Sequence, residues 1–367
     1  MKKIAVLIAF VMIFLFSGCK EEKQLTVIED DNPVRFTEIS LPYFSEAAIL
    51  RSFDGKYACF TAQKAGSSIE GENPMPQTVQ ILVYDTENQT VETDWYADSY
   101  IGCVMDAEYK DGSIYYVSAD YESKKQTVNI YDDGKITEVY SFPYEPISSR
   151  FIDLIKDKNG NILFIYKDKE YNMKIGIARE EKREIMYNMS GDSEYSVYNL
   201  IVDGKNNKGL YNAQFNTVNY ANSTFYIDRW NADKIETVRL VPVFSRFFTI
   251  TGDNAFYYEI ADTDKGKEIL LTGESLTNET TTVVRNLGKG TVFKHWNGDE
   301  YMIYLLKDND KYSFRAVKSE EMQITARDVD FDFSTDNVTV CIAKDKALLA
   351  EEYEFGETSG LYIADLY

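Results

Sequence analysis

Short apolar runs alternate with polar turn residues along most of this 367-residue chain. A typical unit opens with an Asp-Gly or Asn-Gly pair and continues with aromatic and β-branched residues, as in Asp111-Gly112 followed by 114–117. These pairs tolerate the positive φ that tight hairpin turns require. Apolar positions at helical spacing do not continue beyond a turn or two. The pattern therefore predicts an all-β chain of short hairpins.

The unit recurs at a nearly constant interval of about 47 residues, and repeats of about 40 to 50 residues with four strands are typical of propeller blades. The pairs that open the units start at Asp54, Asp111, Asn159, Asp203, Asp253, Asn297 and Asp336, and Asn222 competes with Asp203. We expect seven four-stranded blades, with six or eight as alternatives. An early strand, at 24–27 or 34–37, is expected to pair with the last strand, 361–366, and close the ring.

This strand rhythm resembles the β-propellers of bacterial surface lipoproteins, of the TolB-like or WD40-like kind. The resemblance spans most of the chain and implies the architecture. It implies no functional residues, because the Gly-His and Trp-Asp pairs of WD40 repeats are missing.

The N-terminal segment differs from the rest. Lys2 and Lys3 precede an uncharged apolar run, 4–16, which is too short to span a membrane and has the length of a signal-peptide core. The run ends in Phe16-Ser17-Gly18-Cys19, which resembles the lipobox of bacterial lipoproteins, although that family usually has an aliphatic residue in place of Phe16. The resemblance implies that Cys19 is acylated before cleavage.

The expected organisation has three parts: a signal peptide over 1–18, the lipidated Cys19 with a tether over 19–33, and a propeller domain over 34–367. The protein would then be lipid-anchored to the cell membrane and face away from the cytoplasm. An uncleaved N-terminal anchor is the alternative.

Charge and cysteine content narrow the possible partners. With 60 acidic and 39 basic residues, the formal charge is −21, which argues against nucleic acid as a partner. Cys59, Cys103 and Cys341 lie in or near apolar stretches, where free cysteine behaves as a small hydrophobic residue. A disulfide between Cys59 and Cys103 stays open.

Catalytic signatures are scarce. The chain has one histidine, so a site with several histidine ligands is excluded, and no Gly-x-Ser-x-Gly or phosphate-binding glycine motif occurs. A carboxylate pair is possible, but the sequence does not indicate which two of 60 acidic residues would form it.

Two sets of residues are candidate binding sites. Asp328, Asp330 and Asp332 alternate with apolar residues, which places three carboxylates on one face of a strand, either as a solvated face or as a calcium site. Apart from this possible calcium ion, no cofactor is expected. Trp95, Trp230 and Trp296 fall near strand or turn ends, where they either bind a ligand or pack between blades.

These observations favour a non-enzymatic binding or scaffold module that contacts an envelope protein or a glycan, besides the membrane through its anchor. Two alternatives stay open. One is an extracellular polysaccharide-active enzyme with a carboxylate pair. The other is a substrate-capture or sensor lipoprotein of a transporter.

Overall fold

The computed structural model describes residues 26–44, 47–63, 77–100, 102–143, 151–156, 161–167, 173–178, 184–189, 196–203, 208–214, 225–231, 234–241, 246–251, 254–263, 266–275, 281–289, 291–297, 301–308, 311–320, 323–331, 337–353 and 358–367. For the strands between 184 and 293 only the backbone is described. In this part of the chain no helix is long and apolar enough to cross a membrane.

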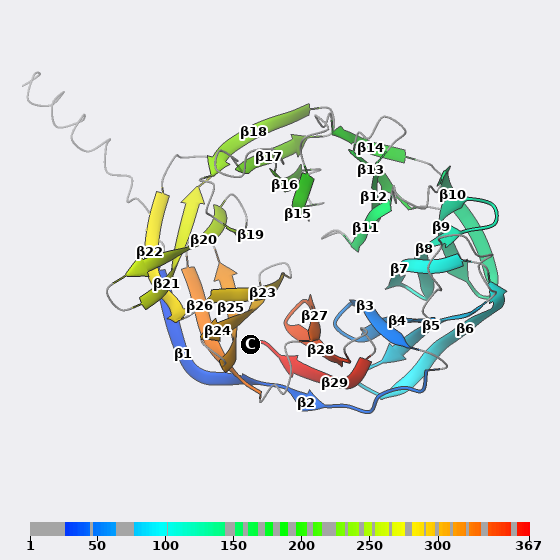
Figure 1. The fold of residues 1–367 in the computed structure, drawn as a ribbon, viewed down its shortest axis with the longest axis horizontal. Helices are drawn as coiled ribbons and strands as arrows, with labels where there is room; N and C mark the ends of the chain where they lie inside the picture. Colours follow the sequence, from blue (N-terminus) through cyan, green and yellow to red (C-terminus); the bar gives the residue numbers. More distant parts are fainter. Residues whose placement is uncertain are drawn as a thin grey trace, which may run out of the picture.

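The described strands form seven sheets arranged in a ring (Figure 1). Blade 1 contains Ala48–Phe53 (β3), Tyr57–Gln63 (β4), Gln77–Asp85 (β5) and Thr90–Tyr100 (β6). Blade 2 contains Gly102–Lys110 (β7), Ser113–Asp120 (β8), Lys125–Asp132 (β9) and Lys135–Pro143 (β10). Blade 3 contains Phe151–Lys156 (β11), Ile162–Lys167 (β12), Met173–Ile177 (β13) and Glu184–Met189 (β14). Blade 4 contains Ser196–Asp203 (β15), Lys208–Gln214 (β16), Phe225–Asn231 (β17) and Lys234–Val241 (β18). Blade 5 contains Arg246–Thr251 (β19), Asn254–Thr263 (β20), Gly266–Ser275 (β21) and Thr281–Lys289 (β22).

The last two blades also include strands from the N-terminal part of the chain. Blade 6 contains Thr291–Asn297 (β23), Tyr301–Asp308 (β24), Lys311–Glu320 (β25), Gln323–Asp330 (β26) and Thr26–Arg35 (β1). Blade 7 contains Val338–Ala343 (β27), Lys346–Glu352 (β28), Thr358–Asp365 (β29) and Thr37–Glu38 (β2). The predicted seven-bladed β-propeller is confirmed, and the expected turn chemistry holds at Asp111-Gly112 and Asp133-Gly134, where all four residues have positive φ.

Aromatic packing between neighbouring blades accounts for the many tyrosines and phenylalanines. Between blades 2 and 3, the ring of Tyr140 lies 5.3 Å from that of Phe164 and 5.2 Å from that of Tyr166. Gly176 makes room for this cluster, because a Cβ there would come within 2.2 Å of the Phe164 ring. Large flat side chains thus fill the wedge between twisted sheets.

The strap, residues 26–39, closes the ring. Thr37 of β2 pairs with Ile363 of β29, as expected for a closing strand from 34–37. The preceding strand, β1, adds in parallel to the outer edge of β26 (Figure 1). Residues 26–33, expected as part of a tether, therefore lie in a strand. One continuous segment joins the edges of blades 6 and 7.

Arginines of blade 6 hold the strap. Arg315 forms an ion pair with Glu29, and Arg327 lies 3.5 Å from Asp30. Arg327 also donates to the carbonyl oxygens of Asn32 at 2.6 Å and of Leu366 at 2.8 Å. One guanidinium therefore binds the N-terminal strap and the C-terminal end of the chain together.

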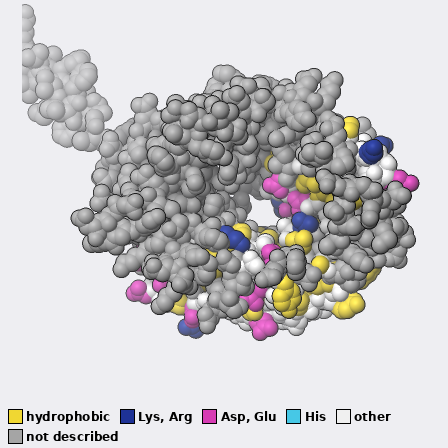
Figure 2. Space-filling model, viewed as in Figure 1, with side chains coloured by type: hydrophobic (Ala, Val, Ile, Leu, Met, Phe, Trp, Pro, Cys, Tyr) yellow, Lys and Arg dark blue, Asp and Glu magenta, His cyan; other side chains and the backbone are white. Residues whose placement is uncertain are grey.

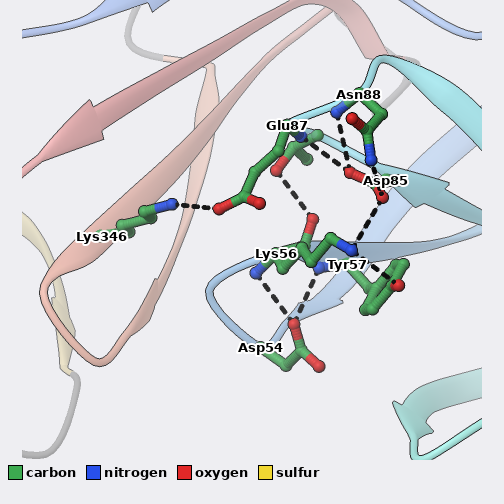
Figure 3. A network of polar contacts seen from close by, with 8 residues as sticks. Asp54, Lys56, Tyr57, Asp85, Glu87, Asn88 and Lys346 are labelled. Carbon is green, nitrogen blue, oxygen red and sulfur yellow. Dashed lines mark hydrogen bonds and ion pairs between the residues drawn. The ribbon is translucent and has the colours of Figure 1, made fainter.

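A polar network joins blades 7 and 1 where their turns meet (Figure 3). Lys346 donates to Glu87 at 2.7 Å, and Lys56 lies 3.1 Å from Asp85. Asp85 is buried, which raises its pKa, but donors from Asn88, Lys56 and Glu87 outweigh burial and lower that pKa to about 2. The carboxylate is therefore ionised at neutral pH and fixes the β5–β6 turn.

Candidate active site

Six of the seven innermost strands carry a β-bulge where they pair with the second strand of their blade. In β3, β7 and β11 the register shifts between Leu50 and Ser52, between Val104 and Asp106, and between Phe151 and Asp153. The same shift recurs before Asn199, Thr249 and Lys294 in β15, β19 and β23, whereas β27 pairs regularly. Bulges re-aim side chains and often lie beside active sites. Asp106 and Asp153 therefore occupy equivalent positions in adjacent blades.

The space-filling view shows a hollow at the centre of the ring, bordered by acidic and basic side chains (Figure 2). The acidic atoms gather on the side where β7 and β11 lie in Figure 1. This is the side on which the bulges of blades 2 and 3 place their aspartates.

Asp106 and Asp153 accept from the same backbone donor. The backbone N–H of Leu154 donates to both, at 3.1 Å to Asp106 Oδ2 and at 3.0 Å to Asp153 Oδ1. Asp106 Oδ1 also accepts from the backbone N–H of Ala107 at 2.9 Å. Backbone groups thus fix both carboxyls, within reach of one N–H group.

The pKa values of this pair lie near neutrality. Burial, then the negative charge of Asp153, raises the pKa of Asp106 to about 7, against the opposing effect of Arg51. Burial also raises the pKa of Asp153 to about 6, although water reaches its side chain through the channel, while the hydrogen bonds from Leu154 and Asp106 lower it. The two groups titrate as a coupled pair that holds one proton around neutral pH.

Glu108 is a third carboxyl in the same region. It follows Asp106 by two residues in β7, so both side chains leave the same face of the strand. Burial, then the charge of Asp106, raises the pKa of Glu108 to about 8, while Lys156 and a hydrogen bond with Ser52 oppose the rise. Glu108 is therefore mostly neutral at pH 7 and adds little charge to the site.

The three cysteines of the described strands are free. Burial, then the nearby charges of Glu108 and Asp106, raises the pKa of Cys59 well above its usual range and that of Cys341 to about 12. A thiol that stays protonated is a poor nucleophile. Cys59 and Cys341 are therefore poor candidates for a nucleophile.

The tryptophans selected from the sequence lie elsewhere. Trp95 packs between blades, with ring centroids 5.6 Å from Tyr116 and 5.7 Å from Tyr131. Trp296 stacks on Phe314 at 5.9 Å. Trp230 lies on β17, and its side chain is outside the described residues. The two described rings therefore occupy packing positions, and ligand binding by them stays a prediction.

The proposed calcium ligands are on the outer edge of blade 6. Asp328 lies 3.4 Å from Arg315, and Asp330 lies 3.4 Å from Arg35 of the strap. Asp332 and the lipidation candidate Cys19 lie outside the described residues. Within the described part, no three His, Cys, Asp or Glu side chains are grouped to hold a metal ion. The calcium site stays a prediction, with arginines as partners of two of its aspartates.

Solved structures with a similar fold include those of proteases and peptidases. No family model matches the chain, and no curated protein is similar to it in sequence. The β-propeller domain of the Trilobed protease from Pyrococcus furiosus matches with a TM-score of 0.57 and 12% identity, over 88% of this chain and 95% of that one. Acylaminoacyl peptidase from Pyrococcus horikoshii matches with a TM-score of 0.54 and 10% identity, over 86% of this chain and 51% of that one. A prolyl endopeptidase matches with a TM-score of 0.56 and 6% identity, over 88% of this chain and 50% of that one.

At these identities the similarity establishes the fold, and the chain spans about half the length of the two peptidases. The expectation of a non-enzymatic binding or scaffold module was wrong, because several of the similar structures are those of proteases and peptidases. The same finding replaces both alternatives, the polysaccharide-active enzyme and the transporter lipoprotein. The sequence missed Asp106 and Asp153 because nothing in it marks the bulges that bring them together. This chain is a seven-bladed β-propeller of the architecture found in those peptidases.

Proposed function

We propose that this protein is a hydrolase-related propeller that cleaves amide bonds of peptides in its channel, with Asp106 and Asp153 as the acid–base pair. One observation carries the proposal: two carboxyls from adjacent blades accept from one backbone N–H group, that of Leu154. A pair that holds one proton at neutral pH offers a base and an acid side by side.

The geometry assigns a role to each carboxyl. Ionised Asp153 accepts a proton from a water molecule, whose oxygen attacks the carbonyl carbon of the peptide. Protonated Asp106 donates its proton to the carbonyl oxygen. Asp153 then passes its proton to the nitrogen while one hydroxyl of the tetrahedral intermediate returns a proton to Asp106. The C–N bond breaks, an amine and a carboxylic acid leave, and the pair again holds one proton. The lower pKa of Asp153, about 6, and the higher pKa of Asp106, about 7, suit this assignment.

Peptides are the proposed substrates because the similar propellers are domains of proteins named as proteases and peptidases. The channel supports this choice, since an extended chain is narrow enough to enter a propeller along its axis. The titratable groups of the site lie on β7 and β11, so a chain in the channel would pass directly beside them.

A cleavage assay tests the proposal. The chain from residue 20 onward is incubated at pH 6.5 with a mixed peptide library, and mass spectrometry follows new termini. We expect cleavage that requires Asp106 and Asp153 together. If the wild-type protein and the double variant Asp106→Asn, Asp153→Asn give the same products, the activity belongs to a contaminant and the proposed function is wrong.

We further propose that the protein is a lipoprotein, anchored through Cys19 and facing away from the cytoplasm. The sequence Phe16-Ser17-Gly18-Cys19 after an apolar run supports the proposal. At least two acyl chains are needed for stable anchoring. In a bacterial host, labelled palmitate should enter the wild-type protein and should not enter Cys19→Ala, which should leave the membrane fraction. Equal labelling of both proteins would contradict the proposal.

A further inference from the structure

Arg51 is the residue that the β3 bulge leaves unpaired, between Leu50 and Ser52. Its side chain is half-buried, and its Nε donates to Thr61 Oγ1 at 2.7 Å. Within the described part of the chain this is its one hydrogen bond, so the Nη1 and Nη2 groups have no acceptor there. A guanidinium presents five donors in a fixed plane. Thr61 uses one and fixes that plane.

The groups facing Arg51 do not form an ion pair with it. Four act on its charge from a distance: Asp106 and Cys103 of β7, Cys59 of β4 and Glu352 of β28. Glu352 accepts from Thr339 at 2.6 Å, and Asp106 accepts from the backbone N–H groups of Ala107 and Leu154. Burial lowers the pKa of Arg51, but arginine starts so high that the side chain stays charged at neutral pH. The guanidinium of Arg51 thus offers a positive charge and two donor groups, Nη1 and Nη2, near Asp106.

We propose that Nη1 and Nη2 of Arg51 bind a carboxylate group of the ligand in the channel. This inference rests on the proposed function and names the substrate class more closely, as a peptide that carries a free carboxylate near the bond to be cleaved. A carboxylate matches the planar fork of a guanidinium through two parallel hydrogen bonds. The acceptors that would otherwise occupy these donors are held by other partners.

Binding at Arg51 should depend on pH through the aspartates. Of the carboxylates that act on the charge of Arg51, Asp106 has the largest effect, and the charges of Asp106 and Asp153 or Glu108 act on one another in turn. Above a pKa of about 7 Asp106 ionises and repels an incoming carboxylate, so affinity falls as pH rises. By linkage, the ligand in turn favours protonated Asp106 and should take up a proton on binding. One linked proton weakens binding by at most about tenfold per pH unit.

Calorimetric titration with N-acetylglycine and its uncharged counterpart N-acetylglycinamide tests the proposal without requiring turnover. At pH 6 we expect the acid to bind at least about tenfold more tightly than the amide, because a charged hydrogen bond is lost with the amide. Arg51→Met should abolish this preference, and Arg51→Lys should restore part of it. Arg35→Met is the matched control, since Arg35 is exposed on the strap.

Three outcomes would overturn the proposal: equal binding of acid and amide, unchanged preference in Arg51→Met, or affinity that rises between pH 6 and pH 8. Thermal unfolding of each variant shows whether a loss reflects misfolding, and the Arg51→Lys variant covers the case in which Arg51→Met does not fold. This test of Arg51 and the test of the proposed function can fail independently of each other. Peptide cleavage without carboxylate preference would reject the Arg51 site alone, and carboxylate binding without cleavage would reject the hydrolase.

Discussion

Replacing Asp153 with asparagine is expected to lower kcat/KM for peptide cleavage by about 10²- to 10⁴-fold, the usual contribution of a positioned acid or base. Asparagine keeps the shape of the side chain and still accepts from the N–H of Leu154. It does not accept a proton from water. Because the fold is retained, the melting temperature should stay within a few degrees of the wild type.

The pH profile gives the second readout for this variant. In the wild type, activity should rise as Asp153 ionises through a pKa of about 6 and fall as Asp106 loses its proton through about 7. The profile is therefore a narrow bell whose two limbs belong to the coupled pair. Residual activity of Asp153→Asn should lack the acidic limb.

Asp132→Asn is the control, because this exposed aspartate at the end of β9 is far along the chain from the bulge of blade 3. It should leave rate and pH profile unchanged. Full activity in Asp153→Asn would remove Asp153 from the reaction and reject the proposed mechanism.

Removing the strap is expected to abolish the stable fold. Val34 is 1% exposed and Ile39 is 8% exposed, and they belong to the cores on either side of blade 7. Burial of two such side chains contributes about 3 to 6 kcal/mol, in a protein whose net stability is of the order of 5 to 15 kcal/mol. Deletion also bares the edges of β26 and β29, which promotes aggregation.

Two truncated chains test this expectation. A chain beginning at residue 26 keeps the strap and should melt as the wild type does, whereas a chain beginning at residue 40 should aggregate or melt at least about 10 °C lower. Arg327→Ala should give a smaller loss, since it removes the bonds to Asn32 and Leu366 but leaves the apolar contacts. Equal melting temperatures for the two truncated chains would show that the strap contributes nothing to closure.

The fold could be predicted because turn chemistry is local. Asp111-Gly112 requires a backbone that few residues adopt, and it marks a hairpin wherever it falls. The prediction is less accurate at the last blade. Asp336-Asn337 precedes the innermost strand β27, whereas the turn equivalent to Asp54-Gly55 is Lys344-Asp345. Lys344 adopts a positive φ of 56° there without being glycine or asparagine, so the sequence hides the turn.

The candidate site could not be predicted because it depends on register. Val104-Met105-Asp106 reads as an ordinary alternating strand, and a shift of one residue would turn Asp106 to another face. The bulge is visible only once β7 is paired with β8. The cation hypothesis for Asp328 and Asp330 rested on unneutralised charge, whereas Arg315 of the neighbouring strand β25 and Arg35 of the distant strap pair with them.

The hydrogen bonds from Arg327 to Asn32 of the strap and to Leu366 also bear on the order in which the chain folds. The strap is synthesised first, yet its partners β26 and β29 are among the last residues made. Closing a loop of this length costs entropy before any contact repays it, and folding dominated by such distant pairings is slow. The growing chain therefore carries a bare strand edge until the final turn is complete. The ring closes as the last step, when the strap and the C-terminal residues both bind the side chain of Arg327.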